Sequence, residues 1–453
     1  MKLQKREGSP GAPAWRRGLT AAVLLSVAGL MAACAMVGDD FESVKSQPGD
    51  WPWWRGPNLD GTSRDANPPL TWSETENIVW KTPVPGRGHS TPSIRGDRIF
   101  LQTADEEKKI QYVNCYRRDN GKELWSTAVH EGAFMPVNGK NTQASSTPAC
   151  DSERVYATFP NGVAIHATAL DHDGNIVWQK AAGEFKCAHG GASSPAIYKS
   201  LLFVAGDNDG ESFLTAFDRA TGDIAWRVKR PTVGSYVSPL VGTVAGRDQL
   251  LLASANEVIS YDPLTGEKLW FSEGPANVMA STLVFSGDLV VATGGFPERK
   301  VLCIRADGTG DVGASKIVWR KERGIAYVPS PVIHDGKVYV LDDNGIVSCW
   351  TLEKGDDLWV KRLEGNFSAS PIYAGGRFYV PNESGVTFVF RAEPEFEILA
   401  RNDLGDGGYA SPVICGDRIY LRTNRYLYCI GSPAVAQPLP RLRPAGRRVE
   451  EGG

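Results

Sequence analysis

Two short acidic clusters beside glycine are the first candidates for chemistry in this sequence. Residues 171–174 (DHDG) and 207–211 (DNDGE) have the alternating oxygens and the glycine with which a calcium-binding loop begins. Neither has the distal glutamate that such a loop carries at its twelfth position. Both also coincide with Asp/Gly turns of the repeat described below, where these residue types favour tight turns. We therefore interpret both clusters as turns, and we expect no metal site.

Nucleophilic and thiolate chemistry has little support. The sequence contains no GxSxG and no CxxC motif, so neither a serine hydrolase nor a metal–thiolate site is expected. The histidines are spread widely, at His89, His130, His166, His172, His189 and His334. A disulfide is possible among Cys150, Cys187 and Cys415, and the sequence does not assign its pairing. The formal charge of −3 offers no basic field for nucleic acid.

The elements that carry these groups recur along the chain. The clearest copy, residues 194–226, runs from a hydroxyl–Pro–apolar start through two strands and their turns to Trp226. The start occurs eight times, at spacings of 56, 47, 44, 44, 48, 40 and 41 residues. Its slot residues are Pro92, Pro148, Pro195, Pro239, Leu283, Pro331, Pro371 and Pro412. Repeats of about 40 to 45 residues with short strands and glycine turns are typical of β-propeller blades.

A tryptophan near the end of each copy predicts how the blades pack. The set is Trp80, Trp125, Trp178, Trp226, Trp270, Trp319 and Trp359, and the copy near Leu399 has lost its tryptophan. Each large planar indole is expected to fill the wedge between adjacent blades as a structural docking group. Because Trp80 precedes the first start, its strand must complete the last blade, with residues 411–430. This closure leaves no free sheet edge. The predicted fold is all-β: an eight-bladed propeller of four-stranded antiparallel blades.

A short hydroxyl residue stands before every slot residue. The set is Thr91, Thr147, Ser194, Ser238, Thr282, Ser330, Ser370 and Ser411. Such a group, repeated where each inner strand begins, is expected to satisfy backbone atoms near a crowded axis.

The turn and tryptophan together carry a family resemblance. The DxxTG turn followed by Trp, at 218–226 and 262–270, resembles the tryptophan-docking motif of PQQ (pyrroloquinoline-quinone) type β-propellers. The resemblance covers about residues 78–430, and the opening WPWWRGPN at 51–58 is similar to that of uncharacterised exported relatives. It implies the fold but not the activity, because the same fold carries quinoprotein dehydrogenases and the outer-membrane assembly lipoprotein BamB.

The resemblance also implies what an enzyme of this family would need. A quinoprotein dehydrogenase would hold PQQ in the central funnel between a tryptophan floor and a disulfide of adjacent cysteines, with calcium and an aspartate base. The sequence has no adjacent cysteines, and its connections barely exceed the repeat. We therefore expect no cofactor, and a PQQ-dependent dehydrogenase is the alternative.

The loops that enter the inner strands all open on one face. Close before the slots they carry a ring of aromatic and polar residues that can bind a ligand or partner. The ring is His89, Gln143, His189, Tyr236, Tyr327, Phe367 and Tyr409. The alternative is that these residues only plug the channel.

The ends of the chain predict export. A basic stretch and a short apolar run in residues 1–33 form a signal peptide, and the MAAC motif at 31–34 makes Cys34 the lipid attachment point. Residues 34–50 are expected to be a tether and 51–77 a Trp-rich strap on the propeller, with an exposed docking patch as the alternative. Residues 78–431 are the propeller, and 432–453 are a disordered tail.

Together these features predict a non-catalytic lipoprotein of the cell envelope. We expect a monomeric propeller that faces the periplasm, with the outer membrane favoured over the inner, and that acts as a protein-interaction or ligand-binding scaffold. Its partners would be envelope proteins or secreted polymers.

Overall fold

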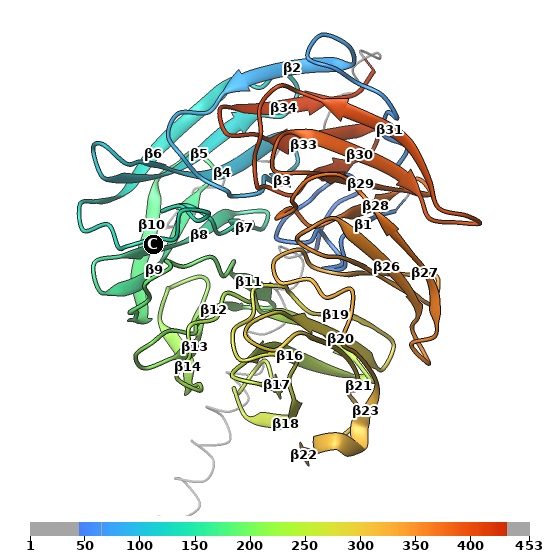
Figure 1. Cartoon of the computed structure of the whole chain (residues 1–453). Helices are drawn as coiled ribbons and strands as arrows, with labels where there is room; N and C mark the ends of the chain where they lie inside the picture. Colours follow the sequence, from blue (N-terminus) through green and yellow to red (C-terminus); the bar gives the residue numbers. More distant parts are fainter. Residues whose placement is uncertain (1–44, 65, 433–453) are drawn as a thin grey trace, which may run out of the picture.

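The described chain folds as a ring of small sheets around one axis. The computed structural model describes residues 45–64 and 66–432, so Cys34, the signal segment, most of the tether and the tail after residue 432 lie outside the described residues. Within that part, eight sheets follow one another around the ring (Figure 1). The predicted eight-bladed, all-β propeller is confirmed.

The first four blades follow chain order from the innermost strand outward, and all pairs within a blade are antiparallel. Blade 1 is β3 (Ser93–Arg95), β4 (Arg98–Asp105), β5 (Ile110–Arg117) and β6 (Glu123–Glu131). Blade 2 is β7 (Ala149–Cys150), β8 (Arg154–Asn161), β9 (Ala164–Asp171) and β10 (Ile176–Glu184). Blade 3 is β11 (Ala196–Tyr198), β12 (Leu201–Gly206), β13 (Phe213–Asp218) and β14 (Ile224–Lys229). Blade 4 is β15 (Leu240–Val244), β16 (Arg247–Ser254), β17 (Glu257–Tyr261) and β18 (Lys268–Glu273).

Three of the remaining blades also run in chain order. Blade 5 is β19 (Val284–Ser286), β20 (Leu289–Gly294), β21 (Lys300–Arg305) and β23 (Ile317–Lys321). Blade 6 is β24 (Val332–His334), β25 (Lys337–Leu341), β26 (Ile346–Thr351) and β27 (Asp357–Arg362). Blade 7 is β28 (Ile372–Ala374), β29 (Arg377–Pro381), β30 (Val386–Arg391) and β31 (Glu397–Asp403).

The last blade joins the two ends of the propeller. It contains β32 (Val413–Cys415), β33 (Arg418–Arg422) and β34 (Tyr426–Ile430), and its outer strand is β2 (Ile78–Pro83). In Figure 1 the blue β2 lies beside the red β34. Trp80 pairs with Cys429 in this blade, as the position of the first tryptophan predicted.

Three short elements supplement the blades. β1 (Thr62–Ser63) pairs in parallel with β28, and β22 (Gly310–Asp311) pairs in parallel with β18. A 3-10 helix, η2 (Gly313–Lys316), precedes β23. Among the described residues there is no helix with the length and apolar character needed to cross a bilayer.

The tryptophans lie at one register position in their blades. Each faces a small residue on the neighbouring strand, for example Cys115 opposite Trp125 and Ala216 opposite Trp226. In blade 7 this position is Ala400, opposite Val389, so alanine stands where the copy near Leu399 has lost its tryptophan. A small opposing side chain leaves room for the indole between two blades.

Most of the indoles dock onto the next blade by a hydrogen bond. The Nε1 atoms of Trp80, Trp125, Trp178, Trp226 and Trp319 donate to backbone carbonyls of the following blade. The turn glycine packs directly on the ring: a Cβ added to Gly222, which has a φ of +76°, would lie 2.6 Å from Trp178 Cδ2. This is why the turn ends in glycine.

Trp270 and Trp359 dock differently because the following turn differs. Trp270 is fully buried by β22, whose Gly310 pairs with it, and its Nε1 donates to Gln249 Oε1 at 2.7 Å. Trp359 lies against Phe396, with ring centroids 5.2 Å apart. The indoles are therefore packing groups in every blade that has one.

Candidate functional site

The eight hydroxyls before the slots form a ring at the axis, which we call the hydroxyl crown. Around it, a backbone N–H of one blade donates to the hydroxyl of the next at seven of the eight junctions, with N···O distances of 2.9 to 3.2 Å. The donors are Thr91, Thr147, Ser194, Thr282, Ser330, Ser370 and Ser411, and Ser411 returns to Thr91. The predicted role of these hydroxyls at the backbone is confirmed.

The eighth junction of the crown is occupied by the strap. Trp54 Nε1 donates to Thr282 Oγ1 at 2.9 Å, where the N–H of Ser238 would complete the ring. The strap lies directly beyond the crown: Trp51 bridges to Ile94, and Cys150 N–H donates to the carbonyl of Pro52. Trp51 and Trp53 are buried in this packing. Trp54 therefore forms the floor of the axial channel.

Arg55 is buried beneath this floor. Its guanidinium donates to the backbone oxygens of Pro331, Pro371 and Asp60, and only 2% of the residue is exposed. Burial lowers the Arg55 pKa to about 10, and the charge of Asp60 opposes this shift. The side chain stays cationic at neutral pH and makes no ion pair with any carboxylate that the structure describes.

Above the floor lies a cavity of about 440 Å³, which we call the axial pocket. Its base is Trp54 and seven members of the crown, all except Ser330. Most of its walls come from the loops that precede the inner strands, and Asp343 comes from the turn between β25 and β26. This volume falls within the range of small-molecule sites, about 300 to 1,000 Å³.

The structure brings five of the seven predicted ring residues to this pocket. These are His89, His189, Tyr236, Tyr327 and Tyr409. Gln143 and Phe367 lie outside the lining, and both are buried. Gln143 Nε2 donates to the carbonyl of Met135 within its own loop, whereas Phe367 packs in the core against Phe388, with ring centroids 6.0 Å apart.

Several lining residues escaped the sequence-based prediction. They are Trp54, Asn138, Lys140, Asn141, Asp343 and Ser368. Asp343 accepts hydrogen bonds from the backbone N–H groups of Tyr327 and Val328, so its carboxylate holds the loop that carries one pocket tyrosine. The three tryptophans in four residues at 51–54 were the available signal for the floor, although no pattern distinguished Trp54 from its neighbours.

A long loop, residues 132–148, reaches across the mouth of the pocket. Asn138 N–H and Asn141 Nδ2 both donate to the carbonyl of His189, and Lys140 Nζ contacts Glu383 Oε1 at 3.0 Å. Glu383 belongs to the loop after β29 in blade 7, 243 residues further along the chain. The 56-residue spacing between the first two slots provides the length for this bridge.

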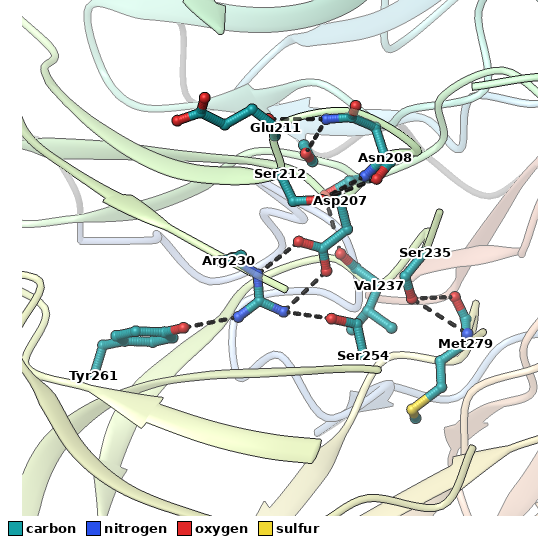
Figure 2. Close-up of polar contacts among 12 residues, drawn as sticks. Asp207, Asn208, Glu211, Ser212, Arg230, Ser235, Val237, Ser254, Tyr261 and Met279 are labelled. Carbon is teal, nitrogen blue, oxygen red and sulfur yellow. Dashed lines mark hydrogen bonds and ion pairs between the residues drawn. The ribbon is translucent and has the colours of Figure 1, made fainter. Parts of the chain in front are cut away.

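The segment that carries Tyr236 joins blades 3 and 4 and is anchored by polar contacts; Figure 2 shows those made by its neighbours Arg230 and Ser235. The Tyr236 N–H donates to the carbonyl of Met279, and Ser235 Oγ bonds the same residue. At the base of this loop, Arg230 Nε and Nη2 contact the carboxylate of Asp207 at 2.6 and 2.9 Å. Arg230 also donates to Tyr261 Oη and to Ser254 Oγ. Arg230 and Ser235 thus anchor the segment that carries Tyr236 at two points.

The two acidic clusters act as turns. The Asp207 carboxylate is occupied by Arg230, while Asn208 Oδ1 accepts the N–H of Gly210. In the other cluster, Asp171 Oδ1 accepts the N–H groups of Asp173 and Asn175. Oxygens used in this way stabilise the turn conformation.

Three hydrogen-bonding groups of the pocket, His89, Tyr236 and Tyr327, are held in neutral forms. Burial, together with the charges of Arg422 and Arg87, lowers the pKa of His89 to about 3. Burial also raises the pKa values of Tyr236 and Tyr327, and it raises that of Asp343 despite its two N–H donors. Near neutral pH, His89 and the two tyrosines are therefore uncharged hydrogen-bonding groups.

A closed ring of eight blades, docked by indoles around an axial pocket, defines a PQQ-type β-propeller protein. The family model described as outer membrane protein assembly factor BamB matches residues 109–326 and 311–394. The chain belongs to this family.

Individual relatives are distant. The BamB protein of Yersinia pestis is 21% identical over 357 residues, which cover 76% of this chain and 86% of the relative. The BamB protein of Bordetella pertussis is 23% identical over 370 residues, which cover 71% of this chain and 89% of the relative.

Solved structures share the fold. BamB from Moraxella catarrhalis has a TM-score of 0.56 at 13% identity and covers 78% of this chain and 99% of its own. A europium-containing methanol dehydrogenase has a TM-score of 0.63 at 11% identity and covers 84% of this chain and 90% of its own. At these identities the likeness concerns the fold alone.

The residues of the axial pocket do not fit PQQ with calcium. PQQ is a tricarboxylate, and Lys140, the single lysine or arginine in the described lining, is already paired with Glu383. Calcium requires several anionic or carbonyl oxygens. The one carboxylate in the described lining, Asp343, already accepts two backbone N–H groups.

Proposed function

We propose that this protein is a non-catalytic scaffold of the cell envelope that holds a ligand or partner protein in the axial pocket. The observation that carries the proposal is the pocket itself. It has a closed floor, three tyrosines on its wall and an accessible mouth on one face of the ring. Aromatic side chains with a polar tip bury area at low entropic cost and keep one hydrogen bond, which suits recognition.

The arrangement also supports binding over catalysis. His89 is held neutral with a pKa near 3, well below the range in which a general base works at neutral pH. Asp343 is engaged with backbone N–H groups. The relatives are named as outer membrane protein assembly factors, and we extend from this name only the general role, with envelope proteins as the partners.

The proposed location follows from the N-terminal motif. Cys34 would carry the lipid, and the propeller would face the periplasm on a membrane anchor. We propose the outer membrane, in agreement with the name of the family.

Crosslinking from inside the pocket tests the proposal. A photoreactive phenylalanine analogue replaces Tyr327 in the full-length lipoprotein in its native membrane, and the same analogue at Tyr198 is the control. Tyr198 is also half-buried, but it lies at the end of β11 outside the pocket. We expect a discrete adduct from position 327 and none of the same mass from position 198.

A triple variant provides the second readout. Alanine at Tyr236, Tyr327 and Tyr409 should abolish the adduct formed from a probe placed at Ser368, with little change in melting temperature. Alanine at three half-buried tyrosines elsewhere, Tyr198, Tyr373 and Tyr426, is the matched control. Equal adduct yields from the two triple variants would contradict a role for the axial pocket in binding.

A further inference from the structure

The hydroxyl crown has hydrogen-bonding capacity that the fold does not use. Each crown hydroxyl accepts one hydrogen bond. Seven accept the backbone N–H of a neighbouring crown member, and Thr282 accepts from Trp54 Nε1. Within the described chain, no hydroxyl of the crown donates a hydrogen bond in return. A hydroxyl carries one proton to donate, so the protons of the crown are available for an acceptor.

These hydroxyls are deeply buried and still line the axial pocket. The seven lining members have exposed fractions of 1 to 5%, so few of their protons are satisfied by open solvent. Buried donors normally have an acceptor, and leaving one unmet costs free energy. An acceptor that enters the pocket therefore meets several convergent O–H groups at its base.

The charge beneath the crown favours an anionic acceptor. The Arg55 guanidinium bonds the carbonyls of Pro331 and Pro371, the residues that directly follow the crown members Ser330 and Ser370. It is fully buried, and the charge of Asp60 acts on it, but neither Asp60 nor any other described carboxylate forms an ion pair with it. A cation in such low-dielectric surroundings acts over a longer range than one in water.

The two charged side chains of the described lining, Lys140 and Asp343, are already engaged. Lys140 is paired with Glu383, and Ser368 Oγ also donates to this glutamate. Asp343 opposes an anion, but its two oxygens accept backbone N–H groups at 2.8 and 3.2 Å. The buried Arg422, whose charge lowers the pKa of His89, adds positive potential, so the preference of the pocket is set by the O–H donors together with Arg55 and Arg422.

We infer that the seven crown hydroxyls that line the axial pocket, all except Ser330, bind a carboxylate group, whose apolar or cyclic body then lies against Trp54 and the wall tyrosines. This inference rests on the proposed function of the axial pocket and names the chemical class of its ligand. One carboxylate suits the site, whereas the several carboxylates of PQQ would exceed the positive charge present. Charge-assisted O–H···O bonds are short and strong, so several of them can replace the water that a carboxylate loses.

Paired small probes test this inference by calorimetry on the full-length protein. Phenylacetate is compared with phenylacetamide, which has the same shape without the charge. We expect phenylacetate to bind about tenfold more tightly or better, because hydrogen bonds to a charged group are the stronger ones. A second experiment compares glucuronate with glucose. If phenylacetate binds more tightly than glucuronate, the body of the ligand is aryl; if glucuronate binds more tightly, it is a sugar.

Two alanine variants separate binding from packing. Ser370→Ala removes a crown hydroxyl that lines the pocket, and Ser330→Ala removes one that does not. Each loses one ring acceptor of similar geometry, at 2.9 and 3.0 Å. Phenylacetate affinity should fall about tenfold in the first variant and stay within about twofold of the wild type in the second.

The outcomes that overturn the inference are distinct from failure of the proposed function. Equal affinity for phenylacetate and phenylacetamide, no binding of any acid at about 10 mM, or equal losses in the two serine variants would each refute the carboxylate site. The comparison within the wild-type protein stands even if a variant fails to fold. An adduct from position 327 together with any of these results would leave the scaffold function intact and remove only the ligand class.

Discussion

The ion pair between Asp207 and Arg230 gives a prediction about both the free energy of unfolding and binding in the axial pocket. Both side chains are buried, with exposed fractions of 4% and 0%. The bidentate contact is supplemented by Tyr261 and Ser254, so the guanidinium is fully engaged (Figure 2). Burial alone would lower the pKa of Arg230, but the charge and hydrogen bonds of Asp207 outweigh burial and raise it.

Asp207→Asn leaves this buried cation without its counter-charge. Removing one partner of a buried ion pair costs about 3 to 5 kcal/mol, because the remaining charge is neither solvated nor compensated. The exposed contacts of Glu273 with Arg320 and Lys300 are the control, and Glu273 and Arg320 have exposed fractions of 36% and 44%. Glu273→Gln should cost about 1 kcal/mol or less. The free energy of unfolding is measured by guanidinium chloride denaturation at pH 7.

The double variant separates the pair from the site. Asp207→Asn with Arg230→Met removes both charges, and it should recover a large part of the loss because an apolar replacement is often neutral. Since Asp207 and Arg230 stand at the base of the loop that carries Tyr236, crosslinking from a probe at Tyr236 should also weaken in the single variant. A loss below about 1 kcal/mol for Asp207→Asn would refute this reasoning.

Four further predictions follow from burial and from the pocket chemistry. Trp319→Ala should lower the free energy of unfolding by about 3 to 5 kcal/mol, and the half-buried Trp359→Ala by less, as measured by denaturation. Burial and the nearby His166 lower the pKa of His130 to about 4, so it is neutral when folded and takes up a proton when unfolded. Stability should therefore fall as the pH drops from about 6.5 to 4, and His130→Gln should flatten this dependence in denaturation midpoints. The seven described cysteines are buried free thiols, and burial raises the pKa of Cys115 to about 12, so a maleimide should label none of the seven until denaturant is added. PQQ added with calcium should give no bound-quinone absorbance, and a stable absorbance would contradict the poor fit described above.

Much of the fold was predictable because the blade motif is local. The start of each inner strand, the alternating strands and the turn before the tryptophan all lie within about 45 residues, so one copy explains the rest. The partner of Trp80 was also predictable, because a leftover outer strand and a last blade with three strands leave one way to close the ring.

The pocket was predictable only in part. Counting back from each slot placed His89, Tyr236, Tyr327 and Tyr409 correctly, because equivalent loops enter the ring alike. The same count failed for Phe367, since a phenyl ring gains more from the core between blades than from the mouth. Trp54 and the contact of Lys140 with Glu383 depend on segments more than 200 residues apart, and no local pattern reports such contacts.

The sharing of the last blade between the two ends of the propeller delays the pairing of β2 during synthesis. Ile78 pairs with Ile430, 352 residues later in the chain. At about 5 to 20 residues per second, ribosomal synthesis of that interval takes roughly 20 to 70 s. During this period the hydrogen-bonding groups of β2 have no native partner, so this strand of the nascent chain can pair with other strands. Any factor that shields residues 78–83 during this interval should raise the yield of correctly closed molecules.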